Sequence, residues 1–268
     1  MRLRPSASRE AACRAQPRSR QHFLVDDNIL SVAGRLAELG PEDVVLEVGA
    51  GLGVLTAYLA ERVRLVHAVE LDRSLEPYLR DALAGRENVE FVLGDALTLP
   101  LEALDPPPGK LVANLPYQIA TPLIAESLDG LPVVELWCVM VQREVADRFF
   151  AVPGTKSYGA VSVLVQLTAE RTGLHPVART VFRPPPNVDS ALVAFRRTRN
   201  WGPEFAHLKE VVQSAFAHRR KTLLNSLGLS RGGRADAESA LEKLGLQPDV
   251  RAEALAPQQF LELAECLP

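Results

Sequence analysis

Four consecutive residues, Asn114-Leu115-Pro116-Tyr117, are of the types needed to hold the exocyclic amine of a nucleobase. The side-chain oxygen of Asn114 and a neighbouring carbonyl can accept the two N–H bonds, while the ring of Tyr117 stacks on the base. When both N–H groups donate hydrogen bonds to these acceptors, the lone pair of the nitrogen leaves conjugation with the ring and points toward an electrophile. Taken alone, the segment is better explained as a strand-ending turn in which Pro116 fixes φ and Tyr117 packs. It predicts a catalytic site only if the chain also binds a methyl donor.

A glycine-rich turn upstream is the candidate donor site. The apolar, β-branched run Val44–Val48 is typical of a buried parallel strand, and Gly49-Ala50-Gly51-Leu52-Gly53 follows it before an amphipathic stretch. A strand, a glycine turn and a helix in this order let a ligand approach backbone N–H groups closely. The dinucleotide fingerprint needs glycine at position 54, where Val54 stands. The Glu-x-Gly-x-Gly-x-Gly spacing instead resembles the first motif of S-adenosylmethionine-dependent methyltransferases.

The next two predicted strands also end in acids. The run of residues 65–69 ends at Glu70, where a carboxylate can bind ribose hydroxyls, and the run of residues 89–93 leads to Asp95, which can hold the edge of an adenine ring. Either acid alone is explained as well by a helix N-cap or a solvated turn. Three consecutive predicted strands each end in a group that can bind the donor: the glycine turn, Glu70 and Asp95. This combination favours a methyl donor over a nicotinamide cofactor.

Together these motifs resemble the ribosomal RNA adenine dimethyltransferase family over nearly the whole chain. The remaining segments that carry the resemblance are Gln21-His22-Phe23-Leu24 with Asp26, Gln142–Ala146 with Arg148, Tyr158-Gly159 with Ser162-Val163, Phe182–Ser190 and Phe216–Thr222. The resemblance implies that the donor is bound by His22, Leu24, Gly49, Gly51, Glu70, Asp95 and Asn114. It implies a substrate site of Asn114, Leu115, Pro116 and Tyr117, with Phe182 helping to stack the adenine.

Two positions depart from the family pattern: His22 stands where asparagine is usual, and Ala50 where proline is common. Histidine can still supply a hydrogen-bond donor or acceptor. Alanine removes no functional group from the turn.

The last four segments resemble the bacterial branch of the family that dimethylates N6 of two adjacent adenosines near the 3′ end of small-subunit rRNA. This implies S-adenosyl-L-methionine as cofactor, rRNA within a (pre-)30S particle as partner, and direct methyl transfer without a general base. Two alternatives stay open. One is a large-subunit adenine methyltransferase of the macrolide-resistance type, and the other is a non-catalytic ribosome assembly factor on a methyltransferase scaffold.

The composition fits a cytoplasmic enzyme. No apolar run reaches membrane-spanning length, and the N-terminus lacks the apolar core of a secretory signal. Cys13, Cys138 and Cys266 are far apart, which favours a reducing compartment and argues against a metal site. A chain of 268 residues can hold one large α/β domain and a small one. We expect a monomer without membrane contact.

The net charge of −3 is unusual for a protein that binds rRNA, so the distribution of charge matters more than its sum. Basic residues gather at residues 1–20, at Arg196, Arg197 and Arg199, and in the helix-like stretch that contains Arg219, Arg220 and Lys221. A solvated surface explains any one cluster equally well. Three clusters together favour contacts to RNA phosphates, with Arg219, Arg220 and Lys221 as the predicted RNA-binding residues.

Strand and helix patterns alternate up to about residue 150, which predicts a doubly wound, Rossmann-like class I methyltransferase sheet. Asp26 or Asp27 is expected to cap a first helix that ends at Gly40. Residues 167–175 and 191–197 are the expected closing strands, and the pattern turns helical from about Trp201 onward. The predicted division is a basic extension at 1–20, a methyltransferase domain at 21–199, and a small all-α domain at 200–268 that binds rRNA or the ribosomal subunit.

Overall fold

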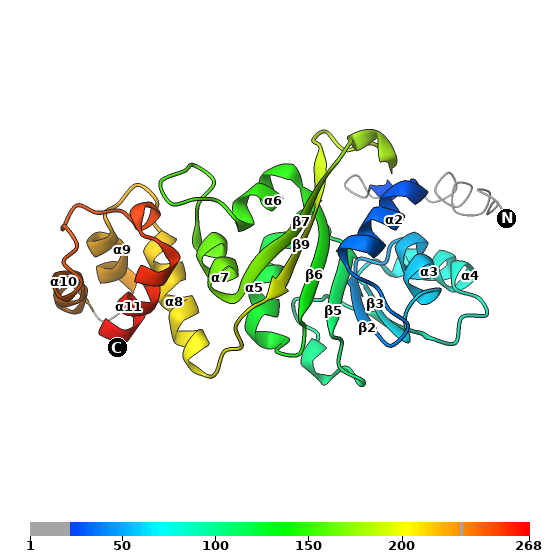
Figure 1. The fold of residues 1–268 in the computed structure, drawn as a ribbon, viewed down its shortest axis with the longest axis horizontal. Helices are drawn as coiled ribbons and strands as arrows, with labels where there is room; N and C mark the ends of the chain where they lie inside the picture. The colour runs from blue at the N-terminus through cyan, green and yellow to red at the C-terminus, as the bar shows by residue number, and fades with distance from the viewer. Residues whose placement is uncertain (1–21, 231–232) are drawn as a thin grey trace. The chain divides into compact units, whose positions relative to one another are not determined.

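The computed structural model of the protein describes residues 22–230 and 233–268, and the chain forms two compact units (Figure 1). The first unit comprises the chain up to Ala146 together with Arg171–Arg197. The second comprises Asp147–Glu170 together with Thr198–Pro268. The predicted extension at residues 1–20 lies outside the described residues. Within the described ranges, no helix is both long and apolar enough to cross a lipid bilayer.

The first unit is built on a seven-stranded sheet with the order β4-β3-β2-β5-β6-β9-β7. Its strands are β2 (Val44–Val48), β3 (Leu65–Glu70), β4 (Val89–Leu93), β5 (Lys110–Asn114), β6 (Leu136–Gln142), β7 (Ala169–Val177) and β9 (Ser190–Arg197). The five strands from β4 to β6 pair in parallel, whereas β9 runs antiparallel to β6. The predicted fold class and the two closing strands are therefore confirmed.

Helices cover both faces of this sheet. They are α2 (Asp27–Leu36), α3 (Val54–Ala60), α4 (Glu76–Ala82) and α5 (Ala120–Gly130). A further helix, α6 (Arg143–Phe149), follows β6, and the first unit ends within it at Ala146. Successive side chains of a strand point to opposite faces. On β6 the Trp137 indole donates a hydrogen bond to Ser127 of α5, while the Cys138 thiol donates to the carbonyl of Ala33 on α2. The sheet is thus doubly wound.

The order of the strands places a switch point between β2 and β5. The chain moves outward from β2 to β3 and β4, then returns to the other side of β2 to form β5. At such a point the two following loops diverge and leave a crevice at the carboxyl ends of the strands, where ligands bind in open α/β sheets. Glu70, Asn114 and the glycine turn after Val48 all lie at this edge.

A separate two-stranded ribbon lies outside the main sheet. Its strands, β1 (Phe23–Leu24) and β8 (Phe182–Arg183), pair antiparallel, with Leu24 opposite Phe182. The Val25 N–H extends the pairing by donating to the carbonyl of Val181 at 3.0 Å. This ribbon fixes the segment that precedes α2.

The second unit is helical. Its helices are α7 (Ala160–Thr168), α8 (Glu204–Phe216), α9 (Leu223–Ser230), α10 (Arg234–Lys243) and α11 (Pro257–Cys266). One face of α8 is apolar and buried, including Phe205, Leu208, Val211 and Val212. The Tyr158 hydroxyl donates to the carbonyl of Leu255 at 2.9 Å, which ties the segment before α7 to the one before α11.

Two boundaries differ from the sequence-based expectation. Asp26 does cap α2, accepting the N–H groups of residues 28 and 29, but the helix ends at Leu36 and not at Gly40. Glu38 has a φ of 49°, and this left-handed backbone cannot continue a right-handed helix. In addition, Asp147–Glu170 groups with the C-terminal helices and not with the sheet. The functional roles assigned to 21–199 and 200–268 stay predictions.

Candidate functional site

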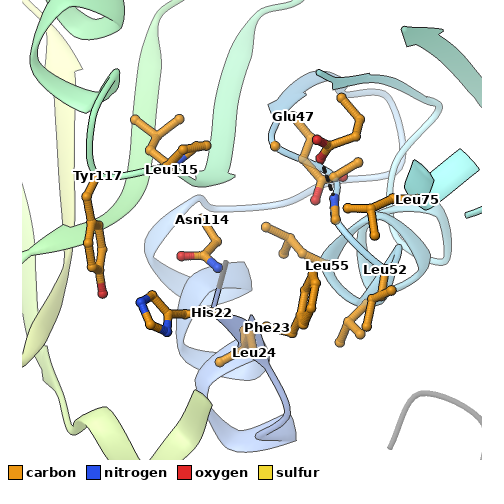
Figure 2. Close-up of a pocket in the computed structure, with 16 residues that line it drawn as sticks. His22, Phe23, Leu24, Glu47, Leu52, Leu55, Leu75, Asn114, Leu115 and Tyr117 are labelled. Atoms are coloured by element: carbon orange, nitrogen blue, oxygen red, sulfur yellow. Dashed lines mark hydrogen bonds between the residues drawn. The ribbon is translucent and has the colours of Figure 1, made fainter. Parts of the chain in front are cut away.

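A pocket opens at the switch point between β2 and β5 (Figure 2). Its empty volume is about 750 Å³, open solvent included. The lining residues come from the segment before α2, the glycine turn, the ends of β3 and β5, and the start of α3. They are His22, Phe23, Leu24, Glu47, Gly49, Ala50, Gly51, Leu52, Val54, Leu55, Glu70, Leu75, Asn114, Leu115, Pro116 and Tyr117. The pocket thus joins the two motifs that the sequence presents separately.

The glycine turn lies in close contact with the predicted catalytic motif, residues 114–117. Gly49 has a φ of 83°, and a Cβ placed there would lie 3.0 Å from Cδ of Pro116. On the other side of the turn, a Cβ on Gly51, whose φ is 60°, would lie 3.5 Å from the ring of Phe23. The absence of side chains lets the backbone come close to both neighbours and leaves the space above it for a ligand.

Glu70 organises this turn. Its carboxylate accepts the Gly51 N–H at 2.8 Å through Oε2 and the Asp72 N–H at 2.8 Å through Oε1. The side chain is only 7% exposed. Each carboxylate oxygen has a further lone pair, so Glu70 can still accept a ribose hydroxyl while it holds the turn.

The predicted catalytic motif is held by its neighbours in the sheet. Asn114 pairs with Met140 on β6, and the Leu115 N–H donates to the Met140 carbonyl at 3.0 Å. The hydroxyls of Tyr117 and Ser190 share a hydrogen bond of 2.9 Å. Burial raises the pKa of the Tyr117 phenol and the bond to Ser190 lowers it in part, so the hydroxyl is neutral. The side chains of Asn114 and Tyr117 line one pocket, where a base and a donor can meet (Figure 2).

The segment before α2 forms one wall of the pocket. Nδ1 of His22 donates to the carbonyl of Pro184 at 2.8 Å, and the imidazole lies 6.0 Å from the Tyr117 ring, centroid to centroid. His22, Phe23 and Leu24 all line the pocket. Histidine at position 22 therefore still faces the predicted donor site and connects it to the loop before β9.

Two predicted site residues lie outside the pocket. Phe182 is 1% exposed and pairs with Leu24, a residue of the pocket wall, across the β1–β8 ribbon, and its stacking on a base stays a prediction. Asp95 follows β4, and its carboxylate accepts the Leu97 N–H at 3.0 Å. Its contact with an adenine ring stays a prediction.

Glu47, the acid of the Glu-x-Gly-x-Gly-x-Gly motif, is a pocket residue that the predicted list of donor-binding residues omits. It is the one charged residue of β2, it is 1% exposed, and it lines the pocket. Burial raises the pKa of its carboxyl to about 8; the nearby Thr56 hydroxyl lowers it, and the charge of Glu70 raises it further. Oε2 of Glu47 and Oγ1 of Thr56 nevertheless make no hydrogen bond among the described residues. An acid inside an otherwise apolar strand is the signal that could have identified it.

The pocket fits the donor implied by the sequence. S-adenosylmethionine is a nucleoside that carries positive charge, and the pocket supplies two carboxylates, a close glycine turn and no Lys or Arg among its described lining residues. Glu47 and Glu70 complement the charge, while apolar side chains such as Leu52 and Leu75 suit the adenine ring.

The predicted RNA-binding cluster lies in the second unit. Arg219, Arg220 and Lys221 are exposed, but they occupy the turn between α8 and α9 and not a helix, because α8 ends at Phe216. The Arg219 guanidinium donates to the carbonyls of Lys156 and Tyr158, at 2.8 and 3.3 Å. Contacts of the three side chains with RNA stay a prediction.

One other basic cluster is partly structural. In the first unit, Arg197 donates to the carbonyls of Leu128, Leu131 and Val134 at 2.7–3.1 Å. Its guanidinium is therefore committed to the protein, and the expectation that Arg197 contacts phosphates is wrong. The basic residues at 1–20 lie outside the described residues.

Gly49→Ala is expected to raise the dissociation constant of the donor about tenfold or more, because the new methyl group would overlap Pro116 and push the turn into the pocket. Gly85→Ala is the matched control: Gly85 also has a positive φ, of 76°, but nothing lies within 4 Å of its added Cβ. Both variants carry the cost of a left-handed alanine, about 1–2 kcal/mol. Calorimetric titration should show weakened binding in Gly49→Ala alone; equal affinities would contradict the importance of the contact.

Tyr117→Phe and Ser190→Ala are each expected to lower kcat about two- to tenfold, the worth of one hydrogen bond that fixes the ring. Because the two hydroxyls act through the same bond, the double variant should be no worse than the poorer single variant. Single-turnover rates for the two single variants and the double variant test this expectation. Losses that simply add would show that Ser190 acts independently of Tyr117.

Known proteins resemble the chain over almost its full length. The family described as "Ribosomal RNA adenine dimethylase" matches residues 13–268. A ribosomal RNA small subunit methyltransferase A from Rubrobacter xylanophilus is 47% identical over 250 residues, covering 93% of this chain and 94% of the relative. A dimethyladenosine transferase from Plasmodium falciparum superposes with a TM-score of 0.72 at 25% identity, covering 90% of this chain and 96% of that one. The 23S rRNA methyltransferase ErmE superposes at 0.64 with 31% identity, covering 91% and 99%.

These matches agree with the geometry of the pocket. The glycine turn, Glu70 and Asn114 lie together at one edge of a methyltransferase sheet. The chain belongs to the ribosomal RNA adenine dimethylase family and is an S-adenosylmethionine-dependent methyltransferase.

Proposed function

We propose that this protein dimethylates N6 of two adjacent adenosines near the 3′ end of small-subunit rRNA. The observation that carries this proposal is the position of Asn114, whose amide shares one pocket with the glycine turn and Glu70. The relative of 47% identity is named a small-subunit methyltransferase, which favours the small subunit over the large one. The substrate is rRNA within a (pre-)30S particle, and the enzyme acts as a monomer in the cytoplasm during small-subunit biogenesis.

In the proposed reaction, the Asn114 side-chain oxygen and the Leu115 carbonyl accept the two N–H bonds of adenine N6, and Tyr117 stacks on the base. Bound S-adenosylmethionine supplies an electrophilic methyl carbon. The protein's contribution is alignment and exclusion of water, which is worth several kcal/mol when the reacting atoms are held near contact. The methylated nitrogen is strongly acidic and loses its proton without a general base. A second transfer needs one acceptor to give way to the first methyl group.

Arg219, Arg220 and Lys221 are proposed to contact RNA phosphates, which position the substrate without reading its sequence. Their exposure in the turn after α8 supports this role. Because the net charge of the chain is −3, the attraction to RNA has to come from local basic clusters such as this one.

The test is to incubate the purified protein and methyl-labelled S-adenosylmethionine with small subunits that lack the modification, and separately with large subunits. Label on adjacent adenosines near the 3′ end of small-subunit rRNA is the expected result. Label in large-subunit rRNA would favour the resistance-type alternative, and binding of small subunits without label would favour a non-catalytic assembly factor.

A further inference from the structure

Two segments that carry the family resemblance, Gln142–Ala146 and Phe182–Ser190, meet in a groove that the proposed reaction does not use. The groove lies in the first unit, and its empty volume is about 840 Å³, open solvent included. Its walls are the end of β6, the start of α6, the short helical turn Arg179–Val181 and the loop before β9. The lining residues are Gln142, Arg143, Glu144, Arg179, Asn187, Val188 and Asp189.

Backbone contacts fix the shape of this groove. Gln142, at the end of β6, pairs with Ser190 of β9. The Arg143 N–H donates to the Asp189 carbonyl at 3.0 Å, and Oδ1 of Asp189 accepts the Arg179 N–H at 3.3 Å. The side chains of the groove are therefore presented on backbone segments that hold one another in place.

The groove adjoins the predicted seat of the target base. The hydroxyl of Ser190 shares a hydrogen bond of 2.9 Å with that of Tyr117, and Val188 lies two residues before Ser190. Two residues of backbone span at most about 7 Å. Gln142 and Asn114 also end neighbouring strands of the sheet. A nucleotide next to a base that stacks on Tyr117 can therefore reach the groove.

Three side chains of the groove are available to a ligand. Arg143 and Glu144 already have partners. Arg179 and Asn187 are exposed, and their side chains make no hydrogen bond or ion pair to another described residue. Val188 is 45% exposed although it is apolar. A guanidinium binds phosphate, an amide reads the edge of a base, and an apolar group covers the face of a base.

The charge of the groove favours a nucleotide over a strongly charged partner. Its two arginines are balanced by two acids, Glu144 and Asp189, so it suits one phosphate beside an uncharged base. We propose that the groove binds the nucleotide next to the target base, with Arg179 on a phosphate, Asn187 on the base edge and Val188 on the base face.

The amide of Asn187 indicates which nucleotide this is. An asparagine amide can donate to N7 and accept from N6 of adenine at the same time, and guanine offers no such pair at these positions. In a substrate with two adjacent adenosines, the groove therefore suits the other adenosine of the pair. This inference rests on the proposed function and deepens it, because it assigns residues that select an adenosine beside the target.

The first experiment compares labelled-methyl transfer by the full chain to two kinds of unmodified small subunit: one with both adenosines, and one in which guanosine replaces one of them. At the adenosine that both share, the wild-type kcat/KM should be about tenfold lower or more beside guanosine. Asn187→Ala should lose most of this discrimination. Asn28→Ala, which changes an exposed asparagine on α2, should keep it.

The second experiment tests the phosphate contact. Arg179→Ala should lower kcat/KM about tenfold on both substrates, because it removes a charged hydrogen-bond donor. Its binding to small subunits should also depend less on salt, with a log–log slope smaller by about 0.7, the value for one phosphate of a single strand. Arg64→Ala is the matched control: Arg64 is exposed and precedes β3, at the opposite edge of the sheet. Calorimetry should find the same donor affinity in all variants.

Three results would overturn the proposal. A wild-type protein that methylates both substrates equally does not read the neighbouring base, and an Asn187→Ala protein that discriminates as the wild type does shows that the amide does not read it. Weaker binding by Arg179→Ala with an unchanged salt slope would indicate a ribosomal protein in the groove. Normal labelling with unaffected variants refutes the groove assignment alone, whereas a wild-type protein that leaves small-subunit rRNA unlabelled refutes the proposed function itself.

Discussion

Asn114→Ala is expected to lower the rate of methyl transfer by at least about 10²–10³-fold, while the dissociation constant of S-adenosylmethionine stays within about twofold of the wild type. The amide is proposed to hold the adenine amine, and removal of one such preorganised group costs about this much in enzymes that depend on it. The backbone should be unaffected, because β5 is held by its pairing with β6 and by the Leu115 N–H. Single-turnover transfer rates and calorimetric titration measure the two quantities separately.

Asn28→Ala is the matched control for this prediction. Asn28 is exposed on α2, and its side chain makes no hydrogen bond to another described residue. Its loss should change neither rate nor affinity. If Asn114→Ala loses donor binding as well as transfer, the amide serves the donor and not the adenine. If it transfers methyl groups at the wild-type rate, the proposed reaction is wrong.

Glu70→Ala is expected to have the opposite effect, raising the donor dissociation constant about 10- to 100-fold. The substitution removes the predicted contact to the ribose and leaves the Gly51 and Asp72 N–H groups without their carboxylate. Hydrogen bonds that involve a charged group contribute about 1.5–3 kcal/mol each, so the glycine turn should loosen and the free energy of unfolding should fall. At saturating donor, the transfer rate should recover most of its wild-type value.

Glu87→Ala is its control, since it removes an exposed carboxylate from the same unit of the chain. Calorimetry should find donor affinity unchanged in this variant. Unchanged affinity in Glu70→Ala would refute the ribose assignment. A loss of stability without a loss of affinity would limit Glu70 to the support of the turn.

Much of the donor site could be predicted from local patterns. An apolar run, a glycine turn and acids at the ends of successive strands are short-range features, and parallel strands bring their carboxyl ends to one edge. The distance between the glycine turn and Pro116 could not be predicted, because it depends on β2 and β5 being neighbours although they are not consecutive in the chain. The burial of Glu47 and the missing partner of its Oε2 atom likewise exist only in the assembled sheet, although the acid itself stands in the glycine motif.

The sequence-based predictions that the structure corrects were wrong for similar reasons. Arg197 looks like a surface cation in the sequence, and only the folded chain places three carbonyls within its reach. The run from 218 to 221 has the composition of a helix but forms a turn. In each case a tertiary contact or a chain reversal overrides the local pattern.

The position of β9 has a consequence for when the enzyme becomes active. β9 lies between β6 and β7 in the sheet, and its first residue, Ser190, holds the hydroxyl of Tyr117. A nascent chain that ends before residue 190 has neither the strand that joins β7 to the sheet nor the hydrogen-bond partner of Tyr117, the ring proposed to stack on the base. Synthesis proceeds from the N-terminus, so the glycine turn and Glu70 are made early, whereas the contacts of residues 182–190 with the segment before α2 and with Tyr117 form only later in translation.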